Sequence, residues 1–342
     1  NIETQKPIIA IRDLGDQQGL APNNNNNNLY SQISSTVGSP RELDVAKNNL
    51  VGRSFPNAEG VQQPYVLGEH FITNVKARRL NTSEYKFNTQ LGYLSLNQRL
   101  NNEQFLAISY SYTVNGSSTV YKVGEFSEEN PVLITKLLKS NSNTDVNSPM
   151  WDLMMKNIYS LNSNQLQAED FLLNVNFRDP NSGGKVNYLP GAIYGSPLNP
   201  FPSDTNLLRL FNWDRLNQNN DLQTGANGVK GDGLFDFVNG ITVDAENGKI
   251  IFTKAQPFGS YLNTVITNAD KTPYIFNDLY SKQKAQASES ALAQRYTIEG
   301  RYKGSQGQGI SLGAINVPQG SVKVTANGAQ LVEGVDYTVD YM

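Results

Sequence analysis

The chain has 342 residues with 28 basic and 31 acidic side chains, which gives a formal net charge of −3. This balance argues against a nucleic-acid partner, because a protein that neutralises phosphates needs a clustered basic excess. There is no cysteine and a single histidine, His70, so disulfides, thiolate chemistry and a zinc site built on several histidines are excluded. No stretch approaches the ~18 consecutive apolar residues of a membrane helix. The chain begins without methionine and stops inside a strand-like run, so we expect it to be a section of a longer protein.

Residues 1–65 are expected to form an irregular N-terminal segment. One strand is predicted within it, over Lys6–Arg12. Asn23–Asn28 is a run of six asparagines. Such a run buries no apolar area to offset the entropy cost of ordering it, so the pattern predicts a mobile loop.

Residues 66–200 are predicted to be a first β-rich unit. Alternating runs over 105–114 and 119–123 flank Asn115-Gly116, and this arrangement is typical of a hairpin. Near 149–160 a helix is predicted, with Ser148 as N-cap and Pro149 at its first position. We expect one face of this helix to be buried; its members are Trp151, Met154, Met155 and Ile158.

Residues 201–342 are predicted to be a second β-rich unit, truncated at its C-terminal end. Helices are expected near 204–217, capped by Asp204, and near 273–281. The Asn-Gly pairs at 247–248 and 327–328 lie between apolar runs and predict hairpin turns. A cluster of prolines near 190–205 predicts the boundary between the units. The predicted fold is therefore mainly β, with antiparallel sheets built of hairpins and about three short helices.

Catalytic patterns in the sequence are weak. Gly309–Gly313 fits the G-x-S-x-G nucleophile pattern, but Ser311 lies in an alternating run and the only histidine is far upstream. Acid pairs such as Glu128-Glu129 and Glu169-Asp170 occur, although a glycosidase needs two carboxyls at a fixed separation. His70 follows Glu69 and is interpreted as an ordinary hydrogen-bonded histidine. We therefore predict a non-catalytic protein.

One polar stretch carries a candidate metal site. Asparagine and aspartate oxygens alternate after residue 213, and a glycine-rich loop leads to a second acidic group. Calcium prefers several oxygen ligands on a loop that can wrap around it. The alternative is that these side chains form Asx turns between a helix and a strand. The candidate calcium ligands are Asp214, Asn219, Asp221, Asp232 and Asp236.

Several long phrases resemble one protein family. They are Trp151–Asn162, Glu84–Phe87 with Leu91–Asn97, Leu216-Asn217 with Asp232–Phe237 and Glu246–Phe252, Gly300–Gly304, and Ile310–Ala326 with Gly334–Tyr341. In sequence and order they are similar to the SprA/Sov family, the giant outer-membrane translocon proteins of the Bacteroidetes type IX secretion system, also linked to gliding motility. The resemblance covers about residues 80–342.

The resemblance implies a section of the wall, cap or plug around an export pore in the outer membrane. It implies an exposed part, at the cell surface or in the pore lumen in preference to the periplasm. Its partners would be other outer-membrane and plug proteins of the secretion system, together with secreted cargo. The alternative function is a cell-surface adhesin or carbohydrate-binding β module, stabilised by calcium.

Overall fold

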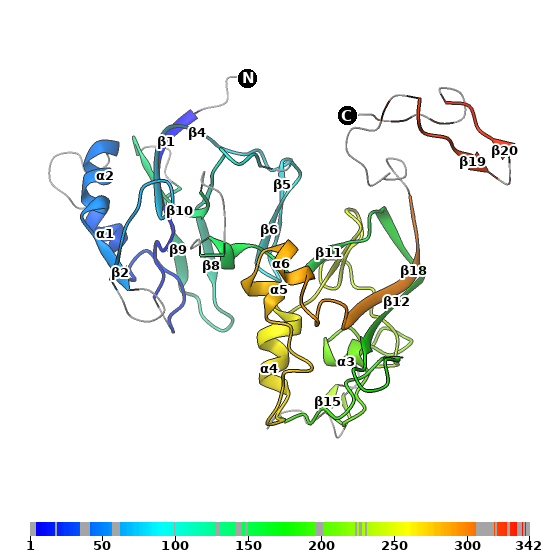
Figure 1. Cartoon of the computed structure of the whole chain (residues 1–342). Coiled ribbons are helices and arrows are strands. Elements are labelled where there is room, and N and C mark those ends of the chain that lie inside the picture. The colour runs from blue at the N-terminus through cyan, green and yellow to red at the C-terminus, as the bar shows by residue number, and fades with distance from the viewer. Residues whose placement is uncertain are drawn as a thin grey trace. The chain divides into compact units, whose positions relative to one another are not determined.

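The computed structural model divides into two compact units (Figure 1). Each unit contains its own buried apolar clusters. Unit 1 comprises Asn1–Met155 with Ser281–Gln283, and unit 2 comprises Lys156–Tyr280 with Lys284–Met342. The structure describes residues 5–17, 19–34, 42–56, 62–98, 100–126, 130–140, 146–147, 150–195, 201–222, 224–225, 228–229, 231–305, 318, 320–326, 329–333, 337 and 339.

A four-stranded sheet organises unit 1. Its strand order is β4 (Phe71–Arg78), β1 (Gln5–Ile11), β10 (Leu133–Lys139) and β7 (Leu106–Ile108). β1 is parallel to β10 and antiparallel to β4. The apolar run in β1 contributes Ile9 and Ile11 to one core cluster and Ile8 to another. This strand is therefore buried on both faces, which explains its nearly continuous apolar sequence.

Two helices cover one face of this sheet. They are α1 (Leu29–Ser34) and α2 (Leu43–Val51), and the short strands β2 (Ser54–Pro56) and β3 (Gln62–Pro64) follow them. Their buried residues join the cluster that contains Ile9: Leu29, Ile33, Ala46 and Leu50. The described residues between 5 and 65 thus supply one of the two central strands and the helical layer of unit 1, so the prediction of an irregular segment is wrong for them. The tertiary packing of this segment is not local in sequence, and for that reason the composition did not reveal it.

Two hairpins complete unit 1. β5 (Tyr85–Asn88) pairs with β6 (Tyr93–Leu96), and β8 (Tyr110–Thr113) pairs with β9 (Val120–Val123). The second is the hairpin predicted around Asn115-Gly116. Tyr112 stacks on Tyr121 across this hairpin, with ring centroids 5.3 Å apart. Such cross-strand aromatic pairs stabilise a two-stranded ribbon.

Unit 2 is built on two three-stranded sheets. One has the order β11 (Ile158–Ser160), β17 (Lys249–Ile251) and β16 (Val243–Asp244). The other has the order β13 (Lys185–Val186), β12 (Asn164–Arg178) and β18 (Tyr296–Ser305). Every pairing in both sheets is antiparallel.

Short helices and hairpins fill the rest of unit 2. The helical elements are α3 (Leu207–Leu210), a π-helical turn at Pro257–Tyr261, α4 (Leu262–Val265), α5 (Asp278–Ser281), whose last residue groups with unit 1, and α6 (Lys284–Ser288). The small hairpins are β14 (Thr224–Gly225) with β15 (Gly228–Val229), and β19 (Thr325–Ala326) with β20 (Ala329–Gln330). The hairpin turns predicted at 247–248 and 327–328 have paired strands on both sides, although residues 327–328 themselves lie outside the described part.

An aromatic cluster forms the core of unit 2, with Trp213 at its centre. The Trp213 ring stacks on Phe252 at a centroid distance of 3.9 Å and meets the edge of Phe235 at 5.2 Å. Its Nε1–H donates to the carbonyl oxygen of Ile251 at 2.8 Å. Trp213 is completely buried, so this one bond satisfies the polar atom that burial would otherwise leave unpaired.

The predicted fold class is confirmed: the protein is mainly β, with antiparallel hairpins and short helices. The helix predicted near 149–160 is wrong, because only a 3-10 turn forms at Trp151–Leu153 before β11 begins. Met154 and Met155, expected in its buried face, are 41% and 47% exposed. Pairing of Ile158 with Ile251 in β17 outweighs the local helix signals.

The two other predicted helices are much shorter than expected. α3 is capped by Asn206, whose side chain accepts from the Leu208 amide, and the chain turns away at Asn212, where φ is +61°. In the range 273–281 only α5 is helical. Within the described residues there are six α-helices rather than three.

The division between the units also differs from the prediction. It falls after Met155, whereas the described residues near 190–205 lie inside unit 2. The physical reason is strand pairing. β11 pairs with β17 and β12 pairs with β18, so residues 158–178 are held to the C-terminal part of the chain.

Candidate functional site

The predicted calcium ligands lie along a long loop in unit 2 that runs from Trp213 to Asp236, and two of them, Asp214 and Asp236, lie at its base. The backbone closes this loop where the Asp236 amide donates to the Trp213 carbonyl oxygen at 2.7 Å. Two carboxylates lie beside that bond, and each accepts hydrogen bonds from the opposite end of the loop. We call Asp214 and Asp236 the loop-base pair.

Asp236 holds the beginning of the loop. Its Oδ2 accepts from the amides of Arg215 at 2.6 Å and Leu216 at 3.2 Å. Burial raises the pKa of Asp236, and the amide hydrogen bonds oppose that rise. The negative charges of Asp214 and Asp232 raise its pKa further. One oxygen atom therefore satisfies two backbone donors at a half-buried position.

Asp214 holds the end of the loop. It is buried, and its Oδ1 accepts from the Gly233 amide at 3.1 Å. Burial is the main cause that raises the pKa of Asp214. A Cβ atom added to Gly231 would lie only 1.6 Å from Asp214 Oδ1, so the chain passes directly over this carboxylate. Only glycine fits there, because a Cβ would also lie 2.6 Å from the Asp214 backbone carbonyl carbon.

Asn219 and Asp221 lie in a separate turn of the same loop. The side chain of Asn217 accepts from the amides of both residues at 2.9 Å, and Leu216 bridges to Leu222 beyond them. Asp232 closes a further Asx turn by accepting from the Leu234 amide at 3.0 Å. Within the described residues, no three or more His, Asp or Glu side chains converge to hold a metal. The geometry therefore favours the Asx-turn alternative, and calcium binding stays a prediction.

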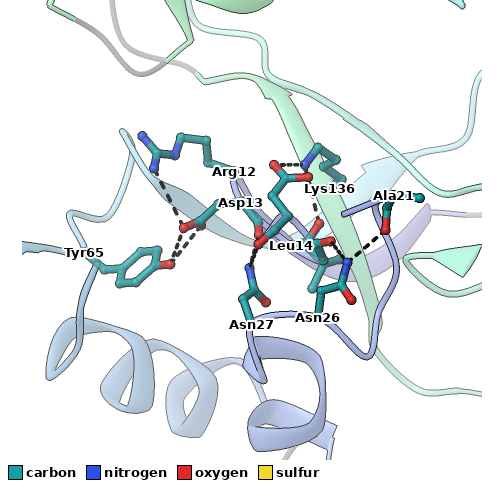
Figure 2. A network of polar contacts seen from close by, with 10 residues as sticks. Arg12, Asp13, Leu14, Ala21, Asn26, Asn27, Tyr65 and Lys136 are labelled. Atoms are coloured by element: carbon teal, nitrogen blue, oxygen red, sulfur yellow. Dashed lines mark hydrogen bonds and ion pairs between the residues drawn. The ribbon is translucent and has the colours of Figure 1, made fainter. Parts of the chain in front are cut away.

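A second polar network, which the sequence did not reveal, lies in unit 1 at the asparagine run (Figure 2). The Asn27 side-chain amide donates to the carbonyl oxygens of Asp13 at 2.5 Å and Asp16 at 2.9 Å. Asn26 donates in the same way to Gly15 and Ala21. The run is thus pinned to the turn after β1, and the prediction of a mobile loop is wrong.

Asparagine suits this position for two physical reasons. Asn27 and Asn28 have φ angles of +50° and +58°, which asparagine tolerates better than most residues. Each asparagine side chain also carries a carbonyl oxygen and an NH2 group, so it can accept from a backbone amide and donate to a backbone carbonyl at the same time. Asn24 uses this match to donate to the Gly124 carbonyl at 3.1 Å and to accept from the Gly124 amide at 2.8 Å.

Charged side chains extend this network towards the sheet. Lys136 of β10 is buried, and its Nζ lies 2.5 Å from Asp16 Oδ2. The Tyr65 hydroxyl donates to the Asp13 carboxylate, at 2.8 and 2.7 Å from its two oxygens. Burial, followed by the Asp13 charge, raises the pKa of Tyr65. This network joins the asparagine run, β1 and β10 in one polar cluster.

The remaining candidate catalytic residues are not brought together. His70 Nδ1 accepts from the Val66 amide at 3.1 Å, and burial lowers its pKa. Asp170 forms an ion pair with Lys303 at the surface. Ser311 and Glu128-Glu129 lie outside the described residues.

Neither protein-family models nor curated proteins match this chain. Within the described residues, no helix has the length and apolar character needed to cross a membrane.

Proposed function

We propose that this chain is a non-catalytic section of an outer-membrane secretion translocon, which acts by holding shape and contacting other polypeptides. The observation that supports this proposal most is where the phrases of the family resemblance lie. Trp151–Asn162 supplies β11, and Glu246–Phe252 supplies β17, its neighbour in the sheet. Gly300–Gly304 lies in β18, which pairs with β12. The phrases therefore supply strands of both main sheets of unit 2, as a scaffold role requires.

The polar side chains support the same proposal. The buried Asp214 and the half-buried Asp236 hold backbone amides, and the network at the asparagine run holds a turn. A scaffold needs such rigid connections between loops and sheets, whereas a catalytic site needs side chains directed at a substrate.

The candidate contact surface is the pair of exposed hairpins in unit 1. Phe87 on β5 is 52% exposed and Val120 on β9 is 55% exposed. Exposed apolar residues on rigid ribbons suit protein contacts, because little side-chain entropy is lost on binding. We propose that these hairpins contact secreted cargo or other outer-membrane proteins of the system.

A secretion assay tests this proposal in cells that carry the complete parent protein. The substitutions Phe87→Ser and Val120→Ser are combined, and cargo is measured in the culture medium and in the cells. The matched control is Lys122→Ser, an exposed polar position on the same hairpin as Val120. The proposal predicts that cargo accumulates in cells with the double variant and not with the control.

A glycan array distinguishes the translocon proposal from the alternative, a carbohydrate-binding module. Saccharide retention by the purified chain, together with normal cargo release by the double variant, would replace the translocon proposal with that of an adhesin.

A further inference from the structure

β18 (Tyr296–Ser305) is an edge strand of the sheet that it forms with β12 and β13. β18 spans ten residues and pairs with β12 along one side, in regular register from Tyr296 to Arg301 and with register shifts beyond Arg301. No other described strand pairs with its outer side (Figure 1). Residues 299–303 are all exposed. A long open edge presents unpaired amide and carbonyl groups, which are a template for another strand.

The register with β12 fixes which face each β18 side chain occupies. Ile298 is opposite the buried Val175, and Gly300 is opposite the buried Leu173. Because side chains alternate along a strand, Glu299 and Arg301 lie together on the opposite, solvent-exposed face. The same alternation places Thr297 and Lys303 on that exposed face.

The sequence of β18 is complementary to itself when two copies run antiparallel about Gly300. Glu299 of each copy then lies opposite Arg301 of the other, which gives two pairs of opposite charge. Thr297 lies opposite Lys303, and on the inner face Ile298 lies opposite Tyr302. Opposite charges across antiparallel strands are favourable, and like charges are unfavourable.

Neighbouring registers are disfavoured by the same rule. A two-fold axis perpendicular to the sheet keeps each side chain on its own face, and paired residues of antiparallel strands share a face. The axis must therefore lie between the two copies of one residue, and not between two successive residues. An axis at residue 299 places Glu299 opposite itself, and an axis at residue 301 places Arg301 opposite itself. An axis at residue 302 places Arg301 opposite Lys303. Among the axes at residues 299 to 302, the axis at Gly300 is the one that pairs the charges without a like-charge contact.

Gly300 suits this centre for a second reason. A Cβ atom there would lie 2.1 Å from the Leu172 carbonyl oxygen of β12, so the backbones of β12 and β18 are in close contact at this point. This proximity anchors the middle of β18 to the sheet. The edge is therefore held extended on one side while its outer side stays open to a partner.

We propose that β18 is a homodimerisation edge, at which a second copy of this chain adds its own β18 antiparallel with Gly300 on the two-fold axis. The proposal is independent of the secretion function, since it rests on the register and charges of one strand. A contact of about seven residues on each side is small, so the dimer is weak and forms with rising concentration.

Sedimentation equilibrium of the 342-residue chain tests the proposal. The wild-type chain is expected to shift from monomer to dimer as its concentration rises. Arg301→Glu replaces two attractive pairs with two repulsive ones, so we expect the dimer dissociation constant to rise at least about tenfold. The matched control is Lys284→Glu on α6, an exposed position with the same change of charge, and it is expected to dimerise like the wild type.

A charge-swap mixture separates the proposal from a loss of folding. Glu299→Arg and Arg301→Glu are each expected to be monomeric alone, and their equimolar mixture is expected to form a heterodimer with two restored opposite-charge pairs. Glu299 also pairs with Lys185, so circular dichroism must show that both variants are folded.

Disulfide trapping then reports the register directly, because the native chain has no cysteine. Glu299→Cys mixed with Arg301→Cys is expected to give a cross-linked dimer, and either variant alone is not. A wild-type chain that stays monomeric at every concentration, a dimer unaffected by Arg301→Glu, or a charge-swap mixture that stays monomeric would each overturn the proposal.

Discussion

The loop-base pair gives the sharpest test of how unit 2 is held together. In Asp236→Ala the amides of Arg215 and Leu216 lose the oxygen atom that accepts from both. Leaving a buried donor unpaired costs about 1–3 kcal/mol, and water reaches part of this half-buried position. We therefore expect the variant to lower the free energy of unfolding by about 2 kcal/mol. For a unit of this size, the unfolding midpoint then falls by about 4–8 °C.

Asp236→Asn is the matched control. Both amides donate to the same carboxylate oxygen, so an asparagine oxygen can accept from both, and the negative charge is not needed. We expect this variant to lose less than about 0.5 kcal/mol, because it also avoids burying a charge among Asp214 and Asp232.

Tryptophan fluorescence supplies the assay, because the chain has two tryptophans, one in each unit. In a Trp151→Phe background, Trp213 reports the unfolding of unit 2 alone. If Asp236→Asn is as unstable as Asp236→Ala, the charge matters rather than the acceptor, and the reasoning is refuted. Calcium is then added to the same samples. A midpoint that rises with calcium in the wild type and not in Asp236→Asn would establish the predicted cation site.

Three further predictions follow from local geometry. Asn27→Ala removes two hydrogen bonds to the turn after β1, so we expect a loss of about 1–2 kcal/mol and faster amide exchange in that turn. Gly248→Ala places a Cβ 1.3 Å from the Ser163 carbonyl oxygen, so we expect it to lower the free energy of unfolding by more than about 3 kcal/mol. Gly240 also has a positive φ, but a Cβ there meets no atom, so Gly240→Ala should lower it by about 1 kcal/mol. Chemical denaturation compares the two variants. The Arg78 hydrogen bond lowers the pKa of Glu84 to about 2. The stabilising effect of this hydrogen bond is therefore present above pH 4.5 and is lost as pH falls towards 2. Carboxyl NMR should show the low titration midpoint of Glu84, and Arg78→Gln should raise that midpoint.

Local patterns predicted the hairpins well. The Asn-Gly turns between apolar runs at 115–116 and 247–248 both join paired strands. The strand predicted at residues 6–12 exists as β1. These features depend on turn chemistry and alternation within a few residues, which a sequence displays directly.

Long-range contacts explain what the sequence could not reveal. The helix predicted at 149–160 fails because Ile158 finds a strand partner more than 90 residues later. The asparagine run is ordered because Asn24 meets Gly124, 100 residues away. The sequence identified Asp214 and Asp236 as candidate metal ligands. That their carboxylates accept hydrogen bonds from backbone amides depends on how the two ends of the loop meet, which the sequence does not display.

Cross-linking in living cells tests the central claim, that the chain works by contacting other polypeptides, most directly. A single cysteine at Phe87 in the cysteine-free sequence is treated with a short bifunctional reagent in cells that secrete cargo, and the adducts are identified by mass spectrometry. The account predicts cross-links to secreted cargo or outer-membrane secretion proteins, which diminish when secretion is blocked. Adducts that are unchanged by secretion, or no protein adduct in cells that export cargo normally, would contradict it.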